Sequence, residues 1–212
     1  MAKGSTGTIL AFIFLSLLLT AGLILSGGIF LIILTLLSWA FSLFVIYFFR
    51  DPNREVPPGE SIVVSPADGK VIIIEEGQEN EFFNGDVKKV SIFMSVFSVH
   101  VNRIPVSGKV TYFNYSKGKF LPAFKDDASY ENEQTSILIE GNKIKVLFKQ
   151  IAGIIARRIV CNIREGARVE QGERFGMIKF GSRVDMVLPA SVNLKIKLDD
   201  NVQAGQTIIG TY

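Results

Sequence analysis

The segment RVEQGERFG at residues 168–176 and the similar segment NVQAGQTIIG at residues 201–210 are the main indication of the fold of this chain. In both segments a valine and polar residues lead to a glycine, Gly172 or Gly205, and an apolar stretch follows. Glycine at such a point supplies the positive φ that a tight turn between strands needs. The two segments therefore predict two similar turns, each leading into a β-strand.

The same style of sequence extends through the rest of the chain from Ser61 onward. Short apolar runs alternate with Gly, Asn, Asp and Pro, and no long helical period follows Phe49. The runs that predict strands are 62–64, 70–74, 87–94, 108–115, 136–139 and 143–148. We therefore expect residues 61–212 to form a mainly β domain with a barrel-sandwich-like architecture, as in lipoyl and biotinyl domains.

The N-terminal segment, residues 1–49, has a different character. No charged residue and no histidine occurs between Lys3 and Arg50, a run of about twice the ~20 residues that one membrane-spanning helix needs. Gly27-Gly28 divides it, so we predict a hairpin of two transmembrane helices, 8–26 and 29–49. A cleaved signal peptide is disfavoured because the apolar run is too long, and one long tilted helix is a further alternative.

The prolines of residues 50–60 predict an extended linker between the hairpin and the β domain. The hairpin puts Lys3 on the same side of the membrane as Arg50 and Arg54. By the positive-inside rule, that side is cytoplasmic. We therefore expect an integral protein of the cell membrane whose β domain lies on the cytoplasmic side.

Composition narrows the chemistry further. A formal net charge of +3 is too small for a protein that wraps nucleic acid. The single cysteine, Cys161, has no partner for a disulfide or a shared metal site. Any imidazole chemistry depends on the single histidine, His100.

Several short motifs are ordinary when each is taken alone. The pair Gly181-Ser182 is most simply a turn, a lone His100 is more often structural than catalytic, and Asp68 in PADG (66–69) suits a turn that caps its own backbone. Their joint occurrence is more specific. The order is FRDP (49–52), PADG (66–69), FMS (93–95), His100 to Pro105, Asn132-Glu133 and GSRVD (181–185).

In this order the motifs resemble those of phosphatidylserine decarboxylase proenzymes, over essentially all of residues 48–212. The resemblance is closest to the short bacterial and archaeal branch, where Arg-Val-Asp follows the Gly-Ser pair, and which includes archaetidylserine decarboxylases. It implies pyruvoyl-dependent decarboxylation of a serine phospholipid, with acyl or ether-linked tails, to the ethanolamine phospholipid and CO₂.

The resemblance also implies how the pyruvoyl cofactor arises. Ser182 would attack the carbonyl of Gly181, and the chain would separate into a β chain (1–181) and an α chain (182–212) that begins with the pyruvoyl group. His100 would act as the base, oriented by Asp68 as in a triad. The pyruvoyl carbonyl would then form a Schiff base with the substrate amine and act as an electron sink, with His100 as the acid that protonates the product.

One position departs from the pattern of longer relatives, which carry a second histidine where this chain has Arg103. An arginine cannot act as a base at neutral pH, but it can bind phosphate or carboxylate. We expect Arg103, Asn132, Glu133 and Phe120 to contribute to substrate binding. The loop KFLPAFK (119–125) is either a buried plug or a lip that dips into the membrane.

The expected partners are a phospholipid membrane with its serine phospholipid and the chain's own two fragments, which form a heterodimer that dimerises further in relatives. No metal and no nucleic acid are expected. The alternative reading is a non-enzymatic, membrane-anchored barrel-sandwich adaptor or a carrier domain modified on a lysine. A carrier presents that lysine within the sequence Met-Lys-Met or Asp-Lys, and neither sequence occurs here.

Overall fold

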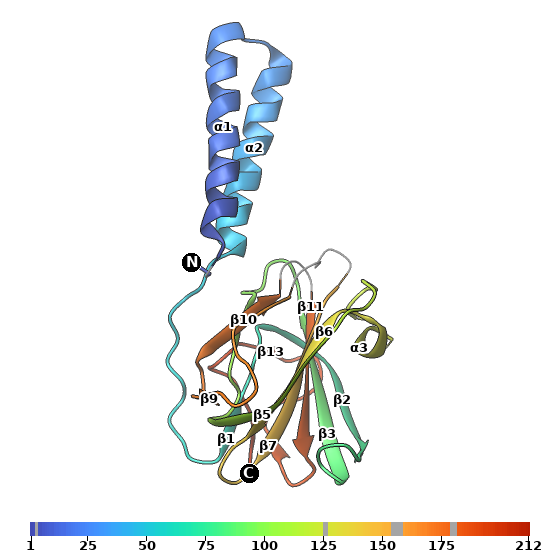
Figure 1. The fold of residues 1–212 in the computed structure, drawn as a ribbon. Coiled ribbons are helices and arrows are strands. Elements are labelled where there is room, and N and C mark those ends of the chain that lie inside the picture. The colour runs from blue at the N-terminus through green and yellow to red at the C-terminus, as the bar shows by residue number, and fades with distance from the viewer. Residues whose placement is uncertain (3, 125–126, 154–158, 179–181) are drawn as a thin grey trace. The chain divides into compact units, whose positions relative to one another are not determined.

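The computed structural model describes residues 1–2, 4–124, 127–153, 159–178 and 182–212. They divide into two compact units, Met1–Pro52, which is helical, and Asn53–Tyr212, which is mainly β (Figure 1). The mainly β class and the pair of apolar N-terminal helices expected from the sequence are confirmed.

The helical unit consists of α1 (Thr6–Ser26) and α2 (Ile29–Phe48). Both helices are long and apolar enough to cross a membrane. Gly27 and Gly28 separate them with φ values of 67° and 104°, a region of backbone space that favours glycine. The observed helix ends differ from the predicted ones by at most two residues.

A small polar seam joins the two helices. The Ser16 hydroxyl lies 2.7 Å from that of Ser38 and 2.9 Å from that of Ser42. The Trp39 indole N–H donates to the Thr20 hydroxyl at 3.1 Å. Hydrogen bonds between small polar residues are a typical means of joining helices in an apolar environment, so this seam suits a hairpin within a bilayer.

In its described residues the β unit contains one short helix and three sheets. Its elements are β1 (Ile62–Val64), β2 (Gly69–Glu79), β3 (Gly85–Met94), β4 (Val101–Arg103), β5 (Gly108–Ser116), α3 (Ala128–Glu131), β6 (Gln134–Glu140), β7 (Lys145–Ile151), β8 (Ile159–Cys161), β9 (Arg168–Val169), β10 (Arg174–Ile178), β11 (Ser182–Pro189), β12 (Asn193–Leu194), β13 (Asn201–Val202) and β14 (Ile208–Thr211).

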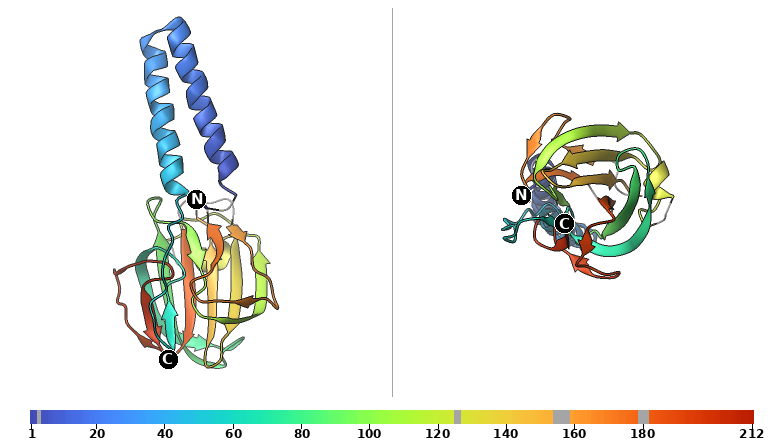
Figure 2. Two further views of the ribbon diagram at one scale, coloured as in Figure 1. Left: turned by 90° about the vertical axis from the view of Figure 1, so that its left-hand side faces the viewer. Right: turned by 90° about the horizontal axis from the view of Figure 1, so that it is seen from below.

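The largest sheet has eight strands in the order β13-β2-β3-β11-β7-β6-β5-β9 and curls strongly, as the right panel of Figure 2 shows. Two three-stranded sheets, β1-β14-β12 and β4-β10-β8, complete the unit. β11 has an antiparallel partner on each side, β3 on one and β7 on the other, so it is a central strand.

One apolar core lies between these sheets. Along β11 the buried core residues are Val184, Met186 and Leu188, every second residue, because successive side chains of a strand point to opposite faces. The small sheets add residues such as Phe175 and Ile209. Ser182 shares the parity of the core-facing residues, which places its side chain at the end of the core.

The two repeated turns lie side by side. Gly172 and Gly205 have φ values of 81° and 73°, as their place in the repeat predicts. The Gly172 N–H donates to the Ile104 carbonyl at 2.8 Å, and the Gly205 N–H donates to the Ser65 carbonyl at 2.7 Å. The first turn is therefore hydrogen-bonded to the segment that follows His100, and the second to the segment that precedes Asp68.

Gly69 allows the tightest backbone approach near the site. A Cβ atom added there would lie 2.1 Å from the carbonyl oxygen of Phe93, whereas one added at Gly77 of the same strand meets no atom within 4 Å. We predict that Gly69→Ala lowers the free energy of unfolding by about 1–3 kcal/mol through overpacking. The matched Gly77→Ala variant should change it by less than about 0.5 kcal/mol. Urea denaturation of both variants measures the difference; equal midpoints would contradict the prediction.

Candidate functional site

Ser182 begins β11 inside the protein. Its side chain is fully buried, it pairs in register with Met94 of β3, and its hydroxyl donates to the Met94 sulfur at 3.3 Å. Gly181, the other half of the expected cleavage site, lies outside the described residues. A serine in this position is too enclosed to be an ordinary surface turn residue.

His100 is also fully buried. Its Nδ1 lies 2.9 Å from the carbonyl oxygen of Ser98. A carbonyl oxygen can only accept, so this contact requires a hydrogen on Nδ1, which leaves the lone pair of the neutral ring on Nε2. The Ser98 carbonyl therefore selects the tautomer that a general base needs.

Asp68 faces a different partner from the one its expected role requires. Its carboxylate forms a two-point ion pair with Arg54, with Arg54 Nη2 at 2.7 Å from Oδ2. It also accepts the backbone N–H of Ala204 at 2.8 Å. The contacts of Asp68 thus fix the linker to the second repeated turn, and its orientation of His100 stays a prediction.

The segments that carry these three residues converge. The Asn102 side chain reaches the Pro66 carbonyl at 3.4 Å, next to the Asp68 turn. The Ile178 N–H donates to the His100 carbonyl at 3.4 Å, just upstream of Ser182. Residues far apart in the sequence therefore meet at the end of the core where β3 and β11 pair.

A buried chain of polar side chains leads to Ser182 through the Met94 sulfur, and sequence reasoning missed it. Thr135 donates to Gln150 Oε1 at 2.8 Å, Gln150 Nε2 donates to Asn102 Oδ1 at 2.9 Å, and Asn102 Nδ2 contacts the Met94 sulfur at 3.7 Å. We call Met94, Asn102, Thr135, Gln150 and Ser182 the polar cluster. Thr135 and Gln150 occupy core-facing positions of their strands, but this parity shows only after the strands are paired.

A second buried network lies on the other side of β11. Arg183 Nε donates to Asp185 at 2.5 Å, and Arg183 Nη2 donates to Ser91 at 2.9 Å. Ser129 of α3 donates to Asp185 at 2.7 Å. Arg183 and Asp185 are part of the GSRVD motif, so the motif marks the ion pair that fixes the start of β11 as well as the serine.

Arg103 lies between the two repeated turns. Its Nη1 donates to the Gly172 carbonyl at 2.9 Å, and its Cδ lies 2.8 Å from the position of a Cβ added at Gly205. Only 5% of Arg103 is exposed. These contacts suit a structural arginine, while its role in substrate binding stays a prediction.

Asn132 fastens the loop that carries Phe120. Its Oδ1 accepts the Leu121 N–H at 2.9 Å, and its Nδ2 donates to the carbonyls of Leu121 and Ala152 at 2.8 and 2.7 Å. Phe120 and Phe124 are 38% and 61% exposed, which disfavours the buried-plug reading of this loop and leaves the membrane lip as a prediction.

Glu133 lies beside Tyr115 and interacts with its hydroxyl. Burial and the neighbouring Glu133 carboxylate, which accepts a hydrogen bond from the hydroxyl, raise the pKa of Tyr115. Tyr115 is therefore neutral at physiological pH and can act as a donor to Glu133.

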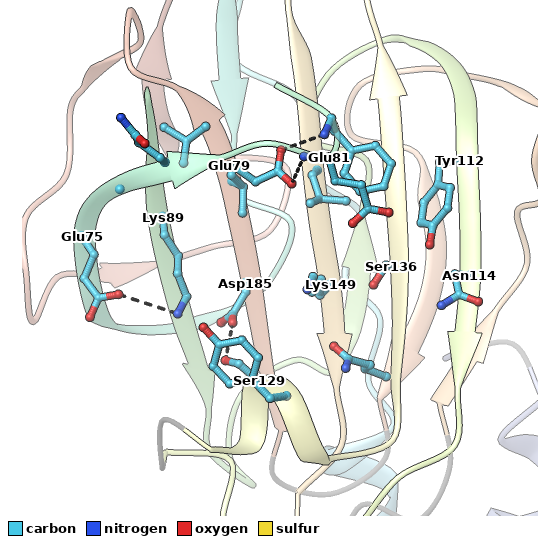
Figure 3. Close-up of a pocket in the computed structure, with 18 of the residues that line it drawn as sticks. Glu75, Glu79, Glu81, Lys89, Tyr112, Asn114, Ser129, Ser136, Lys149 and Asp185 are labelled. Carbon is cyan, nitrogen blue, oxygen red and sulfur yellow. Dashed lines mark hydrogen bonds and ion pairs between the residues drawn. The ribbon is translucent and has the colours of Figure 1, made fainter. Parts of the chain in front are cut away.

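A hollow of about 510 Å³ lies on the other face of the large sheet (Figure 3). Asp185 and Val187 line it, whereas Ser182 has the parity of the core. Its rim is fixed by Glu79: burial alone raises the pKa of Glu79, but three backbone N–H donors and Lys149 outweigh burial and lower it. The hollow is thus a polar groove separate from the Ser182 site.

Cys161 does not offer a competing nucleophile. Burial raises the pKa of its thiol above the ordinary value. A thiol reacts as the thiolate, so the raised pKa keeps Cys161 in its unreactive form at neutral pH.

A fully buried serine at the start of β11 and a fully buried histidine make this part of the β unit a candidate enzyme site. The phosphatidylserine decarboxylase family model matches residues 41–210. The chain is 50% identical over 174 residues to a phosphatidylserine decarboxylase proenzyme of Syntrophus aciditrophicus, with 81% of each chain covered. It is 53% identical over 173 residues to that of Chlorobium chlorochromatii, again with 81% of each covered, and 43% identical over 204 residues to that of Chlorobium phaeobacteroides strain BS1, with 96% and 95% covered. The chain belongs to the phosphatidylserine decarboxylase family.

The Arg54–Asp68 ion pair gives a test of the geometry around the site. Its side chains are only 6% and 12% exposed, so Arg54→Ala leaves a nearly buried carboxylate without its counter-ion. We predict a loss of about 3–5 kcal/mol in the free energy of unfolding. Glu55→Ala, at an exposed neighbour, should change it by less than about 0.5 kcal/mol. Chemical denaturation measures both; equal stabilities would show that the pair contributes nothing.

Proposed function

We propose that this protein decarboxylates a serine phospholipid, phosphatidylserine or its ether-linked equivalent, after it has cut its own chain between Gly181 and Ser182. Membership of the phosphatidylserine decarboxylase family supports the reaction. The observation that carries the proposal is that Ser182 and His100 are both fully buried, with the segment just upstream of Ser182 hydrogen-bonded to the His100 backbone through Ile178.

The cut begins with the Ser182 hydroxyl. The oxygen attacks the carbonyl carbon of Gly181, the amide C–N bond breaks, and the nitrogen of residue 182 takes a proton, so that an ester replaces the amide. Loss of the Cα proton of residue 182 then expels the Gly181 carboxylate together with the serine oxygen. Water hydrolyses the resulting dehydroalanine, ammonia leaves, and a pyruvoyl group caps the new chain.

His100 is the proposed base for the first step. A serine hydroxyl is a weak nucleophile until a base accepts its proton. The Ser98 carbonyl holds the proton on Nδ1, so Nε2 is the nitrogen that accepts. We propose Asp68 as a residue that acts from farther away, through the turn that it fixes next to Asn102.

The structure around residue 182 suits a chain that is cut there. Residues 182–212 supply β11, β13 and β14, which pair with β1, β2, β3 and β7 of the remainder, and β12, which pairs with β14. These hydrogen bonds do not depend on the bond before residue 182. The two fragments therefore stay together as a heterodimer, with the new N-terminus fixed at the end of the core.

The pyruvoyl group supplies a carbonyl that binds the substrate amine and takes up the electrons when CO₂ departs. The chain's own residues do the rest. His100 delivers a proton to the product carbon, and Arg103, Asn132, Glu133 and Phe120 stay proposals for contacts with the lipid.

The apolar helices support a membrane location. We propose that α1 and α2 form a transmembrane hairpin, which keeps the β unit on the cytoplasmic side by the positive-inside rule. A lipid substrate then never has to leave the bilayer completely.

Electrophoresis of the purified protein under denaturing conditions tests the cut. We predict a large fragment that ends at Gly181 and a short one, 182–212, whose N-terminus is blocked. Ser182→Ala should abolish both the cut and the conversion of phosphatidylserine to phosphatidylethanolamine. A native chain that stays intact after long incubation would favour the non-enzymatic adaptor instead.

His100→Ala tests the base. We predict a cleavage rate that falls by roughly 10²–10⁴-fold, because that is the usual contribution of a positioned general base. Ser98→Ala is the matched control, since it keeps the backbone carbonyl that binds His100 Nδ1, and it should cut at the native rate. Complete cleavage of His100→Ala would exclude this histidine as the base.

A further inference from the structure

The polar cluster occupies a place where apolar side chains would ordinarily lie. All of its members are at most 2% exposed, and they pack among core residues such as Val184 and Phe148. Burying hydroxyl and amide groups costs free energy unless each is hydrogen-bonded. A fully connected chain of such groups rigidifies the part of the core that contains it.

The donors in this chain of contacts all point toward Met94. The Thr135 hydroxyl and the Gln150 amide each donate toward the site, and Asn102 Nδ2 ends the chain at the Met94 sulfur. The Ser182 hydroxyl reaches the same sulfur from the other side. A methionine side chain has three rotatable bonds and is adaptable by itself, so this sulfur needs an external contact to stay in place.

We infer that Met94 is a positioning residue for the self-cleavage of the chain, held in place by Asn102, Gln150 and Thr135. This inference rests on the proposed function. The thioether is a weak acceptor; it directs the Ser182 hydroxyl without competing with a base for its proton. When the serine oxygen bonds to the carbonyl carbon of Gly181, the proton passes to His100, and the sulfur gives up only a weak contact.

Met94 can position the Ser182 hydroxyl only before the chain is cut. The serine oxygen leaves with the carboxylate of residue 181, so the contact between that oxygen and Met94 exists only before the cut. Substitutions in the polar cluster should therefore slow cleavage more than they slow decarboxylation per pyruvoyl group.

The experiment measures cleavage of the full-length membrane protein over time by electrophoresis, and turnover normalised to pyruvoyl content. Met94→Leu removes the sulfur at similar volume, and Thr135→Val removes the hydroxyl at the far end of the chain. We expect cleavage to slow roughly tenfold or more in Met94→Leu, since misplaced reacting groups are costly, and by a smaller factor in Thr135→Val. Thr135→Ser, which restores a hydroxyl, should recover the native rate.

A matched control is Thr111→Val, because the Thr111 hydroxyl has no hydrogen-bond partner within the described part of the chain. It should cut at the native rate. Native cleavage rates in Met94→Leu and Thr135→Val would overturn the inference, and so would a loss of turnover per pyruvoyl group as large as the loss in cleavage. If the native chain itself stays uncut, the proposed function fails instead.

Discussion

The position of β11 between β3 and β7 is the constraint on which the site depends. The strand is hydrogen-bonded on both sides, and its side chains must alternate between the core and the opposite face. That alternation sends Ser182 inward with Val184 and Met186, and sends Arg183 and Asp185 to the other side. A shift of one residue in this pairing would move the serine from the core to the opposite face of the sheet.

The two faces of β11 serve different purposes. On the outer face, the Arg183–Asp185 ion pair and its hydrogen bonds with Ser91 and Ser129 fix the position of the first residues of β11. On the inner face the polar cluster interrupts the apolar core around Ser182. A buried ion pair is weak support for stability by itself, and here it lies where a new chain terminus would have to stay in place.

Burial of Ser182 also bears on the order of events. The Ser182 hydroxyl is fully buried, and exclusion of water strengthens hydrogen bonds around a buried group. In the proposed reaction, this burial would protect an ester at residue 182 from premature hydrolysis. It would also keep a lipid headgroup away until the upstream chain end is released.

Several features could be predicted from local sequence alone: the apolar run of α1 and α2, the positions of most strands, the positive φ of Gly172 and Gly205, and the Gly181-Ser182 motif. These follow from local chemistry, namely length, hydrophobic period and the conformational freedom of glycine. Other contacts became visible only once the chain was folded: Asp68 faces Arg54, the Ser98 carbonyl orients His100, and Thr135, Gln150 and Asn102 form a chain that ends at Met94. Apart from the contact between Ser98 and His100, these contacts join different segments of the chain. Sheet order and register choose their partners, and no local pattern specifies either.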